Sequence, residues 1–394
     1  MTSRSVLLSS NYDAWPEAFN GQAFAFLNVI RAIENADLLC PQPAAYTSGR
    51  GVNPQVQYLW HELIHRIQTR AVRALGRPGL SNAQPVTVEQ NYDLFMFMCQ
   101  FPLELTVLNR IHGWRKRCGL AVAYLLESWP ERFPHQRAEL KLLDQFDHVF
   151  VLNAECIPAL QQYTRTPVSF LATACDTLLA SPWPELPERH IDVLSIGRRM
   201  PSLHDKLVEL SSHDGRFLYV HDVVRGGSVT NWHEHRLQSA KLIKRSKYFI
   251  AYDFSVDTTG VFKGVRKQAL ATRYFEGAAG GAVLLGSRQS CPQFAEYFDW
   301  PDAVIPLPPD IDDVGAFLST LDAQRTRVEQ IRSNNMIQSL RRHDWAHRWL
   351  QILDVLGLEH PPMLTHRINR LNSLAAVIES TSAEGLGFRA RVSA

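Results

Sequence analysis

Residues 273–286 read RYFEGAAGGAVLLG, and this stretch decides the fold class. It predicts a helix that ends in small residues, a tight turn at Gly280 and Gly281, and a strand that is apolar along its whole length. Glycine suits the turn because it adopts backbone angles that other residues avoid. A strand without polar alternation is typical of a parallel sheet covered on both faces. The stretch is therefore expected to form one helix–turn–strand unit of a larger α/β sheet.

Strands and helices alternate on both sides of this unit. In the first half of the chain we expect strands at residues 6–9, 92–98, 120–126, 148–152 and 168–171, and helices at 24–33, 56–75, 102–117 and 155–163. In the second half we expect strands at residues 192–195, 217–220, 248–251, 282–285 and 304–306, and helices at 203–210, 233–245, 265–278, 313–356 (with breaks) and 364–380. This alternation predicts two α/β domains with parallel sheets.

A proline-rich segment separates the two series of strands. Residues 181–189 read SPWPELPER, and their three prolines disfavour both helix and sheet. A chain of 394 residues is also long enough for two hydrophobic cores. We expect an N-terminal Rossmann-like domain at residues 1–176, a linker at 177–190, a second Rossmann-like domain at 191–360, a helix at 361–380 that packs back on the first domain, and a frayed tail at 381–394.

The composition is that of an ordinary globular protein. With 41 Lys and Arg against 39 Asp and Glu, the chain lacks the strongly basic character of a nucleic-acid binder. The first fifteen residues hold only a short apolar run, and no stretch approaches the ~20 apolar residues that span a bilayer. The six cysteines form no CxxC pair and are expected to be free thiols. These features indicate a cytoplasmic protein.

Two charged residues in the stretch at residues 273–286 suit the binding of a nucleotide. Glu276 lies near the expected helix end, and a carboxylate there can accept hydrogen bonds from a ribose diol. Arg273 precedes it by about one turn on the same face, and its guanidinium suits a diphosphate. A surface ion pair on an ordinary helix is the alternative interpretation of the same pattern.

A second candidate segment, residues 192–206, reads DVLSIGRRMPSLHDK. An expected strand leads into Gly197, then Arg198 and Arg199, then a helix start, with Lys206 one turn further on. Junctions of this kind lie at the carboxyl edge of a parallel sheet, where ligands bind in open α/β folds and helix N-termini favour phosphate. A solvated turn with basic residues is the alternative.

Four motifs together resemble a known family. They are IGRR at residues 196–199, RYFEGAAGGAVLLG at 273–286, FDWPDAVIPLP at 298–308 and RRHDWAHRWLQIL at 341–353. In combination they resemble the glycosyltransferase group 1 family, and most closely its spore-maturation-type (CgeB-like) branch. The resemblance covers residues 191–356, whereas the N-terminal half matches only in pattern. It implies the GT-B fold, in which two Rossmann-like domains face each other across a cleft.

The resemblance also implies roles for individual residues. Glu276 matches the acidic residue that holds the donor ribose. The residues that match the diphosphate end of the site are Arg273, Gly280, Gly281, Gly197, Arg198 and, more weakly, Lys206. Many relatives carry two glutamates spaced E-x7-E, and Gln268 stands at the first of these positions, so the standard two-glutamate retaining chemistry is in doubt. Lys263, before the same helix, is a further candidate for a phosphate contact.

A competing motif occurs at residues 61–65, which read HELIH. On a helix, His61 and His65 would share one face and could bind zinc, with Glu62 as general base. Against this, no HExxHxxGxxH extension exists and the surrounding residues fit the first α/β domain. We therefore expect no metal site.

Catalytic candidates in the first domain follow its strands. Glu127 comes directly after the strand at residues 120–126 and could act as a base, although a carboxylate that caps the next turn is the alternative. His135, in the following loop, is a second candidate. The loop at residues 11–13 and the pair Asn20–Gly21 follow the first strand, where they could touch acceptor or phosphate.

The expected reaction is attack of an acceptor hydroxyl on a nucleoside-diphosphate-sugar, with a nucleoside diphosphate as leaving group and no required metal. The acceptor is open: a glycan, a lipid-linked glycan, a protein or a small molecule, with peripheral contact at the inner membrane face if it is lipid-linked. Two alternatives also stay open, a nucleotide-sugar-binding module without turnover and a sugar-nucleotide epimerase.

Overall fold

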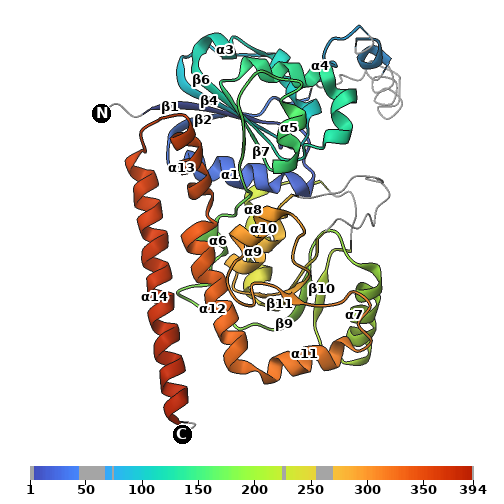
Figure 1. The fold of residues 1–394 in the computed structure, drawn as a ribbon, viewed down its shortest axis with the longest axis vertical. Helices are drawn as coiled ribbons and strands as arrows, with labels where there is room; N and C mark the ends of the chain where they lie inside the picture. The colour runs from blue at the N-terminus through green and yellow to red at the C-terminus, as the bar shows by residue number, and fades with distance from the viewer. Residues whose placement is uncertain (1–3, 44–66, 73–74, 224–227, 254–268, 393–394) are drawn as a thin grey trace, which may run out of the picture. The chain divides into compact units, whose positions relative to one another are not determined.

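The computed structural model describes residues 4–43, 67–72, 75–223, 228–253 and 269–392 of the chain, with side chains to residue 382. It divides into two compact units, residues 1–172 and 173–394 (Figure 1). The division falls just before the predicted linker, of which residues Thr177–Ala180 form a short helix, α6. Each unit is an α/β structure around its own parallel sheet, as the alternation of strands and helices predicts.

The first unit is built on a six-stranded parallel sheet in the order β2-β1-β4-β6-β7-β8. The strands are β1 (Ser5–Ser10), β2 (Asn35–Leu39), β4 (Tyr92–Cys99), β6 (Cys118–Leu125), β7 (His148–Val151) and β8 (Val168–Phe170). Helix α1 (Gly21–Arg31) follows β1. The central strands β4 and β6 are almost completely buried because both of their faces are covered, and this explains their continuous apolar runs.

Three elements of the first unit differ from the prediction. Residues 102–117 are not one helix: a 3-10 helix, η2 (Pro102–Arg110), gives way to a short strand, β5 (Ile111–His112), that pairs with β3 (Val86–Thr87). Gly113 then adopts the left-handed conformation, at φ 79°, directly before α3 (Trp114–Arg117). A left-handed residue interrupts a helix, so residues 102–117 cannot form a single one. Residues 154–160 form only η5 (Ala154–Cys156) and α5 (Ile157–Leu160). The edge strand β2 is half-exposed and lacks the apolar run that reveals a strand.

The second unit holds a five-stranded parallel sheet in the order β10-β9-β11-β12-β13. Its strands are β9 (Ile191–Ser195), β10 (Tyr219–His221), β11 (Ser246–Ala251), β12 (Val283–Gly286) and β13 (Ile305–Pro306). The connecting helices are α7 (Pro201–His213), α8 (Trp232–Lys244), α9 (Thr272–Ala279) and α10 (Pro292–Tyr297). These elements confirm the predicted strands and the helices at 203–210 and 233–245 to within a few residues. The described part of the helix predicted at 265–278 is helical only from Thr272, and α10 was not predicted.

Small residues let α9 pack closely on the sheet. A Cβ atom at Gly277 would lie 2.5 Å from Leu284 and 2.6 Å from Phe249, so only glycine fits without repacking. At Gly286 (φ 152°) a Cβ atom would lie 1.9 Å from the carbonyl oxygen of Ala251. The small residues in the stretch at residues 273–286 are therefore explained by the close approach of helix and strands.

Four helices end the chain: α11 (Val314–Ala323), α12 (Arg325–Arg342), α13 (Trp345–Val355) and α14 (Pro362–Val392). In Figure 1, α14 (red) runs beside α12 (orange), and both contribute to one apolar cluster that includes Leu340 and Leu371. The backbone is helical to Val392, and the fraying expected from residue 381 stays a prediction. The expected contact of residues 361–380 with the first unit stays a prediction.

Glu104 gives the first unit a pH-dependent stability. Burial raises the pKa of Glu104 to about 7, although the N–H groups of Phe101 and Gln100 oppose this shift. An unfolded glutamate titrates near ~4.3, so between these values the folded protein holds a proton that the unfolded chain releases, and stability falls as the pH rises.

We expect Glu104→Gln to raise the free energy of unfolding by about 1–3 kcal/mol at pH 8, with the gain fading towards pH 4.5. Urea titrations at the two pH values measure this. The exposed glutamate Glu131 is the matched control, and Glu131→Gln should show no such trend. Equal gains for Glu104→Gln at both pH values would contradict the assignment.

Candidate functional site

The strand order of the second unit defines one topological switch point. The first strand, β9, lies between β10 and β11, so the chain leaves β9 towards one neighbour and later returns on its other side. Open α/β sheets bind ligands outside the carboxyl ends of the strands at this point. The segments there are residues 196–200 after β9 and residues 252–271 after β11, of which 254–268 lie outside the described part of the chain.

Three of the predicted donor-site residues meet at this switch point. Gly197 turns the chain at φ 79°, and its N–H donates to the carboxylate of Asp222. Arg273, in the first turn of α9, donates from Nη1 to the carbonyl oxygen of Arg198 over 3.1 Å. A Cβ atom at Gly197 would lie 3.2 Å from Nη2 of Arg273, so the glycine leaves room for the guanidinium. The tertiary structure thus brings residues 197–198 and Arg273 together.

Burial makes the Arg273 guanidinium electrostatically costly. Desolvation lowers the pKa of Arg273 to about 10, and the charge of Arg198 acts in the same direction, whereas Tyr274, Glu276 and Asp222 act against it. Loss of hydration disfavours the charged form of any buried cation. An anionic ligand at this position would stabilise that charge, so the local electrostatics favour a phosphate-bearing group.

Glu276 lies in the second turn of α9 and forms an ion pair with Arg236 of α8. The two side chains are only 18% and 16% exposed. Burial opposes the charge of Arg236, but the Glu276 carboxylate outweighs this effect, and the pKa of Arg236 is raised. The ion pair fixes one carboxylate oxygen of Glu276.

Sequence reasoning missed Asp222 and Arg236. Asp222 directly follows β10 at the carboxyl edge of the sheet, and this position is a signal that could have revealed it. Arg236 lies in the first turns of the helix predicted at residues 233–245, which the structure confirms as α8, with Asn231 accepting the N–H of Glu234 as N-cap. Its approach to Glu276, forty residues away in sequence, depends on the packing of α8 against α9.

Two other predicted donor-site elements lie in different surroundings. Lys206 donates from Nζ to the carbonyl oxygens of Asp310 (3.1 Å) and Ile311, so its ammonium group holds a neighbouring loop. Its phosphate contact stays a prediction.

The Gly280–Gly281 turn lies at the C-terminal end of α9 and leads into the amino end of β12. Arg189 donates to the carbonyl oxygens of Gly280 (2.9 Å) and Ser246 (2.7 Å) at this end of the sheet. Close contacts with Ile243 and Met336 account for the absence of side chains in the turn. The contact of this turn with the diphosphate stays a prediction. The position of the turn at the amino end of β12 disfavours it.

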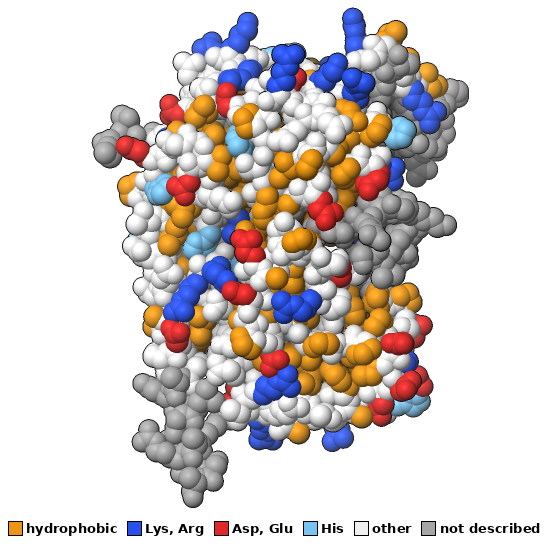
Figure 2. Space-filling view, in the orientation of Figure 1, with side chains coloured by type: hydrophobic (Ala, Val, Ile, Leu, Met, Phe, Trp, Pro, Cys, Tyr) orange, Lys and Arg blue, Asp and Glu red, His pale blue; other side chains and the backbone are white. Residues whose placement is uncertain are grey.

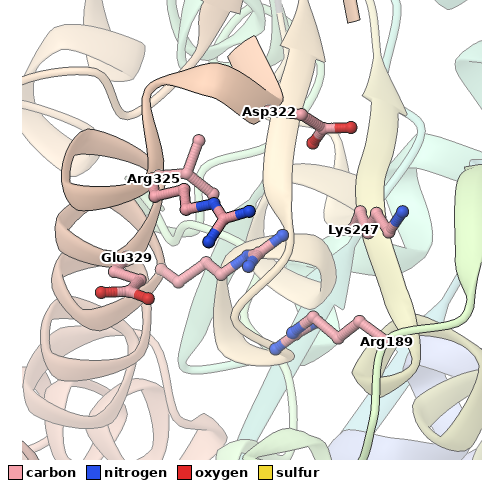
Figure 3. Close-up of a pocket in the computed structure, with 7 residues that line it drawn as sticks. Arg189, Lys247, Asp322, Arg325 and Glu329 are labelled. Atoms are coloured by element: carbon pink, nitrogen blue, oxygen red, sulfur yellow. The ribbon is translucent and has the colours of Figure 1, made fainter. Parts of the chain in front are cut away.

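A cavity of about 190 Å³ lies next to this turn, at the edge opposite the switch point (Figure 3). It is lined by Arg189, Lys247 and Asp322, and by the α12 side chains Arg325, Val328, Glu329 and Arg332. Lys247 is paired with Asp192 over 2.7 Å, and the bonds of Arg189 to backbone carbonyls stabilise the ends of α8 and α9. These contacts give Lys247 and Arg189 structural partners.

The catalytic candidates of the first unit differ in how firmly they are held. Glu127, two residues beyond β6, accepts a hydrogen bond of 2.8 Å from Nε1 of Trp129 and is partly buried. His135 is exposed near the end of the 3-10 helix η3 (Pro130–Gln136). Their roles in catalysis stay predictions.

Several predicted residues lie outside the part of the chain that the structure describes. They are Lys263, Gln268 and the HELIH motif with His61, Glu62 and His65. Among the side chains that are described, no group of three or more His, Cys, Asp or Glu is arranged to hold a metal ion.

Comparison with known proteins identifies the second unit. Residues 198–354 match the model of the glycosyl transferase-like family. Within the second unit, this segment is therefore similar to glycosyl transferases. The matched segment contains both Arg273 and Glu276, whereas the resemblance to the CgeB-like branch stays a prediction. A search of curated proteins finds no significant match.

Solved glycosyltransferases share the fold of the whole chain. An alpha-glucosyltransferase in complex with UDP and a 13-mer DNA is 9% identical, with 90% of this chain and 100% of that chain covered at a TM-score of 0.51. HepE of Anabaena, in complex with UDP-glucose, is 12% identical, with 89% and 99% covered at a TM-score of 0.50. These similarities confirm the GT-B fold for this chain.

The surface of the second unit mixes side chains of all kinds: Figure 2 shows hydrophobic, basic and acidic groups interspersed over its visible face. Within the described ranges, no helix is both long and apolar enough to cross a membrane.

The Gly197 turn offers a test of the site. Gly197→Ala places a side chain at φ 79° and 3.2 Å from Arg273, so we expect a loss of about 1 kcal/mol in stability and weaker nucleotide-sugar binding as the guanidinium gives way. Thermal melting and calorimetric titration measure the two effects.

Gly215→Ala is the matched control, because a Cβ atom there meets nothing within 4 Å. It should leave binding unchanged. Wild-type affinity in Gly197→Ala would show that Arg273 does not contact the donor.

Proposed function

We propose that this protein is a glycosyltransferase, which takes its sugar from a nucleoside-diphosphate-sugar bound at the carboxyl edge of the second sheet. The observation that carries the proposal is the convergence, at the switch point, of the Gly197 turn, Arg273 and the Arg236–Glu276 ion pair. Charged groups gathered at a switch point are the usual signature of a ligand site in open α/β sheets.

The diphosphate is proposed to bind near Arg198 and Arg273. The first turn of α9 carries Arg273, and the orphan N–H groups of a helix N-terminus add a partial positive charge. The guanidinium is planar and presents several donors, which suits phosphate oxygens. Because this cation is buried, its interaction with an anion is weakened less by solvent than at the surface.

The donor ribose is proposed to bind Glu276. Arg236 engages Oε1 of the carboxylate, and a carboxylate has enough lone pairs to accept further hydrogen bonds from two ribose hydroxyls. The ion pair also restricts rotation of the carboxylate, so less conformational entropy is lost on binding. Arg236 would thus act as a positioning residue for Glu276.

In the proposed reaction, an acceptor hydroxyl oxygen bonds to the anomeric carbon while the bond from that carbon to the diphosphate oxygen breaks. The hydroxyl proton passes to a base, for which Glu127 is our first candidate and His135 the second. The nucleoside diphosphate leaves with the electron pair, and Arg273 with Arg198 would stabilise its negative charge.

Replacing Glu276 tests the donor site. We expect Glu276→Ala to weaken binding of the preferred donor about tenfold or more, because the ribose loses a charged acceptor and Arg236 is left with a buried, unpaired charge. Ligand-detected NMR with UDP-, GDP-, dTDP- and ADP-sugars measures this, and release of nucleoside diphosphate is followed in the same samples.

Glu296→Ala, at an exposed glutamate on α10, is the matched control and should bind donors like the wild type. Unchanged affinity in Glu276→Ala would place the ribose elsewhere. Binding without any release or transfer, over a panel of acceptors, would argue against turnover.

We also propose that transfer needs no divalent metal, because arginine side chains can neutralise the leaving diphosphate. Donor turnover is therefore expected to continue at an unchanged rate after treatment with EDTA. Loss of turnover that Mg²⁺ or Mn²⁺ restores would contradict this, and EDTA already saturated with Mg²⁺ serves as the control.

A further inference from the structure

Three aromatic side chains of the first unit gather in a cluster, which we call the aromatic platform: Trp15, Phe19 and Phe101. The ring centroids of Trp15 and Phe19 lie 5.4 Å apart, and Phe101 lies 5.8 Å from Trp15 and 6.0 Å from Phe19. Trp15 and Phe19 are 42% and 40% exposed. Large aromatic rings usually bury most of their surface, so the exposure of two neighbouring rings requires an explanation.

The platform lies at the switch point of the first sheet. Strand β1 is placed between β2 and β4, so the chain reverses its direction of travel across the sheet at β1. Trp15 and Phe19 follow the carboxyl end of β1, and Phe101 follows the carboxyl end of β4. Ligands of open α/β sheets bind in this crevice.

The backbone around the rings is held in place before any ligand binds. Trp15 donates its N–H to Asn11 over 3.1 Å, and its carbonyl oxygen accepts the side-chain N–H of the buried Asn20 over 2.7 Å. The N–H of Phe101 donates to Glu104 over 2.8 Å. Because these bonds fix the loop, a ligand that stacks on the rings pays little ordering entropy.

Polar groups accompany the rings. The amide of Gln22 donates to that of Gln100 over 3.5 Å across the same switch point, and Asp13 accepts from Gln42 over 3.0 Å. Residues 11–22 read NYDAWPEAFNGQ, with two acidic residues and no Lys or Arg. A loop of this charge repels a nucleic-acid backbone or an anionic lipid surface, both of which bind Lys and Arg.

We propose that the aromatic platform binds a sugar ring of a neutral glycan acceptor. A pyranose has an apolar C–H face that can lie on the negative face of an aromatic ring, and hydroxyl edges that suit amides and carboxylates. Trp15 and Phe19 supply the apolar surface, and Gln22 and Asp13 supply polar partners. The inference rests on the proposed function and narrows its acceptor to a carbohydrate.

The test uses the full chain labelled with 5-fluorotryptophan and observed by fluorine NMR. The chain has 9 tryptophans, and loss of one resonance in Trp15→Phe assigns the signal of Trp15. The probes are cellobiose, maltose, lactose and chitobiose at millimolar concentrations, with vesicles of phosphatidylglycerol and phosphatidylcholine and a thymidine oligonucleotide as separate arms. We expect at least one disaccharide to shift the Trp15 signal saturably.

Phe19→Ala should lower the affinity for that saccharide by about fivefold or more. An aromatic contact contributes about 0.5–1.5 kcal/mol beyond its buried area, and this contribution is lost. Leu186→Ala removes an apolar side chain that is 58% exposed in the second unit and should change nothing. Circular dichroism melting confirms that each variant is folded. Once the Trp15 resonance is assigned, the titrations of the wild type test the proposal without any variant.

A Trp15 signal that no saccharide moves would overturn the proposal, as would a signal moved only by vesicles or only by the oligonucleotide. Adding the nucleotide-sugar panel to the same samples separates the two proposals. Donor binding that depends on Glu276 without any saccharide effect defeats the aromatic platform alone. A saccharide effect without donor binding defeats the donor site alone.

Discussion

A buried carboxylate in the second unit supports the helix that carries the proposed donor-site residues Arg273 and Glu276. Asp344 is fully buried and accepts both the N–H and the hydroxyl of Thr177, together with the N–H of Ala346 at the start of α13. Arg367 of α14 donates to both of its oxygens and also pairs with Asp176. Burial alone would raise the pKa of Asp344, but the charge and hydrogen bonds of Arg367 lower it.

This network fixes residues 173–177, which in turn back helix α9. Cys175 exchanges backbone hydrogen bonds with His343 and Trp345, and its thiol donates to the carbonyl oxygen of Phe275 over 3.5 Å. Removing one partner of such a buried pair leaves an uncompensated charge, which costs far more than the pair contributes. The positions of Arg273 and Glu276 therefore depend on contacts made by the last helix of the chain.

The two sheets use their switch points in different ways. In the second unit the crevice is built from charged groups, with Arg273 and the Arg236–Glu276 pair beside the Gly197 turn. In the first unit the corresponding place carries exposed rings and neutral amides, with no basic residue in the loop after β1. One fold thus offers an environment for an anionic nucleotide and another for a neutral, ring-shaped ligand.

The sequence by itself determined the two parallel α/β units and most of the strands, and it pointed to the Gly197 turn and Arg273, because apolar runs and glycine turns are local signals. It could not reveal β2, whose edge position leaves it without an apolar run, or the break of residues 102–117, which β3 and Gly113 impose. Only the tertiary structure decided that Arg236 pairs with Glu276, that the Gly280–Gly281 turn bonds to Arg189, and that Phe101 joins Trp15 and Phe19. Each of these contacts joins residues at least forty positions apart, and such pairings follow from how the elements pack rather than from any pattern along the chain.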